Sequence, residues 1–175
     1  RVPWGWAMGA FALALLSKSI AIVLPAVLAV HAALFGSLYW RETKRLVAGL
    51  ALIGAAYIVG VWQFIARATI DQPVRGYDEQ IWTQVKALVF YVKMLIWPSG
   101  QSIDHQFLVS DSPFDPIAAP AFALLLSLLF VALRYRREHP ILAFSYAWFL
   151  LVLAPSSVVP LNVLVNEHRL YIPGL

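Results

Sequence analysis

Long apolar runs, separated by short charged breaks, make up most of this chain. A helix needs about 20 apolar residues to cross a bilayer, and a shorter one crosses where the bilayer thins around it. The runs that meet or approach this length cover residues 2–16, 20–39, 46–66, 117–133 and 141–155. The pattern predicts an all-α fold, a polytopic membrane helix bundle of about five spans.

The segment 67–116 breaks this pattern. It opens with polar and turn-forming residues, and 80–97 then follow an amphipathic pattern of helical period. The polar residues of that helix share one narrow stripe: Thr83, Lys86 and Lys93. We predict an external loop over 67–116 that carries an interfacial helix at 80–97. The alternative, that 85–97 crosses the membrane, stays open because this part is strongly apolar.

Lys and Arg collect in two of the breaks, 40–45 and 134–138, with three in each. Short loops rich in Lys and Arg stay on the cytoplasmic side of a membrane. With both basic turns inside, Lys18, the 67–116 loop and the residues after Pro155 fall on the external face. We therefore expect a multi-pass integral membrane protein, and the family resemblance given below implies the bacterial inner membrane as its location.

Composition agrees with this prediction and excludes other classes. The chain is 61% hydrophobic and 13% charged, whereas a soluble domain is about half apolar and about a quarter charged. It has no cysteine, which excludes disulfides and thiolate metal sites. The basic residues lie in the membrane turns, so nothing favours nucleic-acid binding. Because an apolar run begins at once after Arg1, we interpret the chain as a piece of a longer protein.

Two polar clusters on the expected external face are candidates for chemistry. Lys18 lies between two predicted spans. It is either a lysine that reaches the membrane surface at a helix end or a cation that binds a phosphate. Asp104 and His105 follow a Trp-Pro-Ser-Gly turn. They could orient a proton, hold a divalent cation or belong to an ordinary loop. Asp111 and Asp115 each stand near a proline, and we interpret them as turn formers.

The strongest candidates are Glu167, His168 and Arg169, three ionisable residues in a row after the last span. Charge beside a membrane-depth segment is costly unless it faces water, a pocket or a ligand. Arg169 offers a fork for phosphate oxygens. Glu167 could act as a base or pair with Arg169 or Lys18, and an ion pair that only closes the bundle remains the alternative. His31, in mid-helix, is either functional or hydrogen-bonded to a neighbouring helix.

Three ordered segments resemble one known family. Residues 16–19, Leu-Ser-Lys-Ser, and the following Leu24-Pro25 resemble the Leu-x-Lys-Glu…Leu-Pro segment of the transmembrane and tetratricopeptide-repeat mannosyltransferases and their bacterial relatives. Residues 95–105, Leu-Ile-Trp-Pro-Ser-Gly-Gln-Ser-Ile-Asp-His, resemble that family's Leu-Leu-x-Pro-x-Gly-Leu-Ser-x-Asp-His loop. Residues 166–173, Asn-Glu-His-Arg-Leu-Tyr-Ile-Pro, resemble its Ala-Glu-Arg-x-Leu-Tyr-Leu-Pro motif. Two positions depart: Ser19 replaces the family's Glu, and His168 falls on its Arg.

The resemblance implies part of a multi-spanning glycosyltransferase of the C type (GT-C). Such enzymes move a sugar from a polyprenyl-phosphate donor to an external protein or glycan acceptor. It implies that the main catalytic acid lies in an earlier external loop and that tetratricopeptide repeats follow, so this piece alone should be inactive. Cationic side chains would bind the donor phosphate, and carboxylates would support catalysis. Further candidate residues lie on the same external face. These candidates are Lys18, His168 and Arg169 for the phosphate, Glu167 and Asp104 in support, and His105 and Tyr171 on that face.

Two alternatives to the transferase remain. A transporter or flippase for a lipid-linked sugar, or a binder without catalysis, would use the same external cations only to hold phosphate. An acid in an earlier external loop would distinguish the enzyme from both. No metal ligand set is assigned from the sequence, and a divalent cation stays an open expectation.

Overall fold

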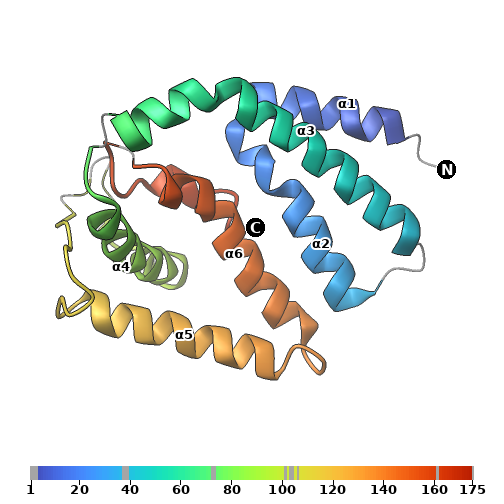
Figure 1. Ribbon diagram of the computed structural model, residues 1–175. Coiled ribbons are helices and arrows are strands. Elements are labelled where there is room, and N and C mark those ends of the chain that lie inside the picture. Colours follow the sequence, from blue (N-terminus) through green and yellow to red (C-terminus); the bar gives the residue numbers. More distant parts are fainter. Residues whose placement is uncertain are drawn as a thin grey trace. The chain divides into compact units, whose positions relative to one another are not determined.

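The computed structural model describes residues 4–36, 40–71, 74–100, 102, 105, 107–160 and 162–174. All regular structure in these ranges is helical, with α1 to α6 joined by the short helices η1 to η3 (Figure 1). The chain divides into two compact units. The first comprises residues 1–65 and 135–155, and the second comprises 66–134 and 156–175. Within the described ranges, the prediction of an all-α fold is confirmed.

The first unit opens with α1 (Trp4–Ser17), the 3-10 helix η1 (Ser19–Val23) and α2 (Leu24–Phe35). Lys18 has an extended backbone between α1 and η1, which interrupts the helix where the sequence places a break. Pro25 lies in the first turn of α2, where its missing N–H costs no helical hydrogen bond. Gly36 ends α2 with a φ of 73°. The span predicted over 20–39 is therefore a 3-10 turn followed by a shorter helix, and 37–39 lie outside the described residues.

The third apolar run forms α3 (Trp40–Ala66), which continues into the π-helical turn η2 (Arg67–Asp71). The prediction of a turn at 40–45 is wrong, because these residues are the first turns of α3. Arg and Lys are good helix formers, so a cluster of these residues does not break a helix. Glu42 lies in the first turn, where a carboxylate interacts favourably with the helix dipole.

Small residues let α3 approach its neighbours in the first unit. One buried cluster there joins α1 and α3: Phe11, Leu15 and Leu50. Gly49 lies under the side chain of Met8, and a Cβ at Gly54 would lie 3.5 Å from Ile22. A Cβ at Gly60 would meet nothing within 4 Å. Two of the three glycines of α3 therefore sit at close helix contacts.

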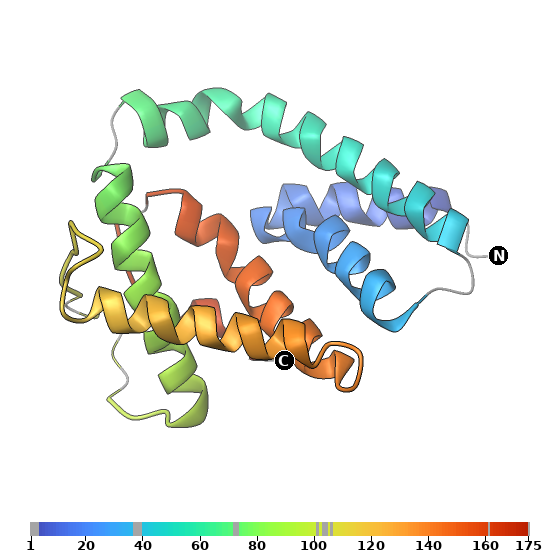
Figure 2. The ribbon, with the colours of Figure 1, turned by 60° about the horizontal axis from the view of Figure 1, so that its bottom comes forward.

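In the second unit, α4 (Tyr77–Ile96) packs across α5 (Ala118–Arg134), as Figure 2 shows with α4 in green and α5 in yellow to orange. The rings of Trp82 and Phe122 meet edge to face at 5.7 Å. The helix predicted at 80–97 is confirmed as a helix that begins three residues earlier, at Tyr77.

Several polar residues of α4 are buried, and they bind the end of α6 and the loop before α5. Gln80 Nε2 donates to the carbonyl of Ser157 at 2.8 Å, and Lys86 Nζ donates to the carbonyl of Leu108 at 2.9 Å. The apolar residues of the helix instead include several exposed ones: Ile81, Leu95 and Ile96. The predicted stripe is split, since Thr83 and Lys86 are buried and Lys93 is exposed. This helix is amphipathic with its polar side inward.

Two helices of the described part are long and apolar enough to cross a membrane. They are Arg41–Ala66 and Pro140–Val158, the latter being α6, each with a mean hydropathy of 1.8. Three other apolar helices are shorter: Trp4–Ser17, Ser19–Phe35 and Ala118–Arg134. Length and composition are therefore consistent with a membrane protein, and they do not confirm a bundle of five spans.

Candidate functional site

The carboxylate of Glu167 joins two parts of the second unit that are far apart in the sequence. Glu167 opens the 3-10 helix η3 (Glu167–Leu170). Its Oε1 accepts a hydrogen bond from the backbone N–H of Ser102 at 2.7 Å and lies 2.8 Å from His105 Nε2. Two of the three clusters identified in the sequence, the loop with the Trp-Pro-Ser-Gly turn and the Glu-His-Arg segment, therefore meet at one oxygen atom.

These contacts favour the ionised form of Glu167. The N–H of Ser102, and then the hydrogen bond from His105, lower the pKa of Glu167 from its ordinary value of 4.5. Glu167 is thus ionised at neutral pH and can only accept, so His105 Nε2 carries the hydrogen between them. A carboxylate with a lowered pKa is a weak base. The geometry therefore favours a positioning role for Glu167. It does not favour Glu167 as the base that takes a proton from a substrate.

The turn that carries Glu167 is fastened to α4 by Tyr91. The backbone N–H of Asn166 donates to the Tyr91 hydroxyl at 3.0 Å, and that hydroxyl lies 3.4 Å from the Asn166 carbonyl. Asn166 also caps η3, since its side-chain oxygen accepts from the N–H of His168 at 3.2 Å. Tyr91 is buried. Sequence reasoning missed this tyrosine, although it lies one helical turn from Ala87 on the buried side of α4.

The two basic residues of the cluster have different surroundings. The guanidinium of Arg169 donates to the carbonyls of Leu164 at 3.1 Å and Val163 at 2.9 Å. Both terminal nitrogens of Arg169 take part, and each carries a second N–H. The side chain of His168 is exposed. Glu167 therefore pairs with His105 and not with Arg169. Arg169 instead stabilises the loop that precedes η3.

The other predicted site residues lie in different places. Lys18 is exposed and belongs to the first unit, whereas the contacts of Glu167 lie within the second. Tyr171 is exposed directly after η3. Asp104 lies outside the described residues. Asp111 is exposed.

Asp115 is a turn former, as predicted, and also caps α5. Its Oδ1 accepts from the N–H groups of Ile117 at 2.8 Å and Ala118 at 3.0 Å. The Ser110 hydroxyl donates to its Oδ2 at 2.6 Å, and Lys86 Nζ lies 3.8 Å from the same atom. The Ser110 hydroxyl first, and then the two backbone N–H groups, lower the pKa of Asp115 to about 2. An aspartate three residues before a helical run is the sequence signal for such a cap.

His31 contacts aromatic rings within the first unit. Its ring lies 4.9 Å from that of Phe35 and 5.7 Å from that of Phe144 on α6. These contacts give the mid-helix histidine a packing role between α2 and α6.

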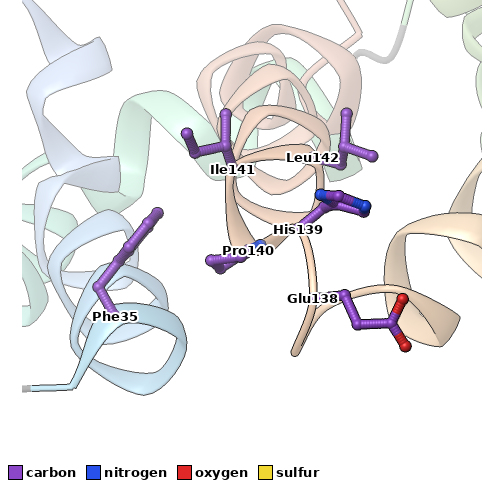
Figure 3. A pocket seen from close by; sticks show the side chains of 6 residues that line it. All are labelled: Phe35, Glu138, His139, Pro140, Ile141 and Leu142. Atoms are coloured by element: carbon purple, nitrogen blue, oxygen red, sulfur yellow. The ribbon is translucent and has the colours of Figure 1, made fainter.

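A cavity of about 460 Å³ also lies in the first unit. Figure 3 shows Phe35 on one side of it and residues 138–142 on the other. None of the site residues predicted from the sequence lines it.

Among the described residues, no group of three or more His, Asp or Glu side chains is placed to hold a metal ion. Asp104, which the sequence places next to His105, is not among the described residues. A divalent cation therefore stays an expectation. No protein-family model, curated protein or solved structure matches this chain.

Proposed function

We propose that this chain is part of an integral membrane glycosyltransferase that moves a sugar from a polyprenyl-phosphate donor to an external protein or glycan acceptor. One observation carries the proposal. Glu167 holds His105 and the backbone of Ser102 at 2.8 Å and 2.7 Å, across more than 60 residues of sequence. These residues belong to two of the three segments that resemble the mannosyltransferase family, and such mutual contact supports a common site.

The membrane location in this proposal includes five crossings, with the basic segments 40–45 and 134–138 in the cytoplasm. Two helices with enough length and apolar character support it, as does the polar-inward burial of α4. A helix whose polar side faces protein and whose apolar side is exposed suits a lipid environment better than water. The site around Glu167 then lies on the external face, together with Lys18.

The proposed chemistry assigns separate roles to the charged groups. An acceptor hydroxyl loses its proton to a general base and attacks the anomeric carbon, and the polyprenyl phosphate leaves. His168 and Arg169 bind the phosphate, on which negative charge develops. Glu167 positions Ser102 and His105. Its lowered pKa makes another carboxylate the better base.

The test measures donor binding and sugar transfer separately, with the full-length protein in liposomes and a radiolabelled polyprenyl-phosphate sugar. We expect His168→Ala to weaken donor binding by up to about fivefold while the melting temperature is unchanged, because one exposed polar contact contributes up to about 1 kcal/mol. Arg169→Ala should lower both donor affinity and stability, since Arg169 also holds two carbonyls. Arg137→Ala is the control, because Arg137 lies in the basic segment 134–138 on the proposed cytoplasmic side. It should change neither donor affinity nor stability.

The outcome can contradict the proposal in two ways. Donor binding without transfer, together with movement of the donor between leaflets, would assign the site to a flippase. Unchanged donor affinity in the His168 and Arg169 variants would assign both residues to structure alone.

A further inference from the structure

The segment 108–117, between α4 and α5, has its polar and apolar groups reversed relative to a loop in water. Its most exposed side chains are apolar, with Phe114 87% and Leu108 81% exposed. Val109 and Ile117 are also exposed. In contrast, Ser110 is 1% exposed and points to α4, where Lys86 is 6% exposed. Exposed loops normally show the opposite distribution.

Part of the backbone of this loop is hydrogen-bonded within the protein. The N–H of Ser110 donates to the Thr83 hydroxyl at 2.9 Å, and that hydroxyl lies 3.4 Å from the Ser110 carbonyl. Lys86 Nζ binds the Leu108 carbonyl at 2.9 Å. Further along, the N–H of Phe114 donates to Ser112 Oγ at 3.2 Å. Non-helical backbone is tolerated at membrane depth only where protein groups take the place of water.

Charge and continuity indicate what covers the four apolar side chains. No Lys or Arg occurs between Lys93 and Arg134. Of the two carboxylates within the loop, Asp115 is bound by Ser110 and Lys86, and only Asp111 is exposed. The apolar surface continues into α5, where exposed residues occur around most of the helix: Phe122, Leu124, Leu126, Phe130, Val131 and Leu133. A helix that is apolar on all sides fits acyl chains, whereas a protein interface has a polar rim.

We propose that the 108–117 loop is inserted in the lipid bilayer, with its four apolar side chains against acyl chains, Ser110 and Asp115 folded onto α4, and the exposed Asp111 at the level of the headgroups. The loop would then anchor the site-bearing unit at the membrane surface. This proposal rests on the membrane location proposed above and does not depend on sugar transfer.

Because the chain has no cysteine, single spin labels test the proposal directly. The Phe114→Cys variant of the full-length protein is labelled in liposomes, and its collision rates with oxygen and with a water-soluble nickel chelate are measured. Leu108→Cys is the second variant. Val59→Cys, 76% exposed on α3, reports lipid, and Asp78→Cys, exposed at the start of α4, reports water.

We expect labels at Phe114 and Leu108 to match Val59, with frequent oxygen collisions and few nickel collisions. A label at Phe114 that matches Asp78 would place the loop in water and overturn the proposal. Low collision rates with both probes would mean that protein covers the loop, which overturns it as well. If Val59 itself shows frequent nickel collisions, the membrane location fails first, and the insertion of the loop fails with it.

Discussion

Replacing Tyr91 by phenylalanine removes one hydroxyl and should loosen the turn that carries Glu167. Tyr91 is 1% exposed, so water cannot replace the lost group without a structural change. The change leaves the N–H of Asn166 without its partner at 3.0 Å. The Asn166 carbonyl loses its contact at 3.4 Å with the hydroxyl but still accepts from the N–H of Arg169 at 3.1 Å. An unsatisfied buried polar group costs about 1–3 kcal/mol. Because the second contact is long, we expect about 2 kcal/mol in total.

The assay is hydrogen exchange of the Asn166 amide and of η3, with the protein in lipid nanodiscs. A local loss of about 2 kcal/mol corresponds to about 30-fold faster exchange. Tyr77→Phe is the matched control, because Tyr77 is 50% exposed on the same helix. It should leave exchange within about twofold, as surface changes do.

Two results would refute this reasoning. Unchanged exchange at Asn166 in Tyr91→Phe would show that the hydroxyl does not hold the turn. An equal acceleration across α4 and α5 would show that the variant destabilises the whole unit and that the site turn has no separate dependence on Tyr91.

Three further predictions follow from the contacts above. Glu167→Gln should release Ser102 and His105, and hydrogen exchange at the Ser102 amide should become faster. The variant should reduce sugar transfer more than donor binding. Equal losses of transfer and donor binding would contradict the positioning role. Because folding lowers the pKa of Glu167 from 4.5 and that of Asp115 from 3.8 to about 2, both stabilise the fold above their ordinary pKa values. Unfolding free energy should therefore fall as pH drops below 4.5 and continue to fall toward 2, whereas a flat acid profile would exclude both carboxylates. Lys86→Met should cost about 1–3 kcal/mol by leaving the Leu108 carbonyl without its donor, whereas the exposed Lys93→Met should cost less than about 0.5 kcal/mol; denaturation of both variants in detergent compares them, and equal costs would refute the role of Lys86.

The predicted site was recovered only in part. The sequence placed His105 and Glu167 on one face because membrane topology groups the loops on one side. It could not pair them, since their contact at 2.8 Å depends on how α4 holds both loops. Nor could it tell whether His168 or Arg169 faces a ligand, because neighbouring residues on a 3-10 turn point about 120° apart.

Local pattern by itself determined the helices, since an apolar or amphipathic period of sufficient length forms a helix in lipid or in a protein core. It predicted α4, α5 and α6 within a few residues of their observed bounds. It misplaced a turn at 40–45, because charge pattern marks membrane boundaries and not helix ends. Only the tertiary structure decided that the polar side of α4 points inward. The periodicity of a helix shows that two faces differ, but burial of Thr83 and Lys86 requires partners, and those lie in loops distant in the sequence.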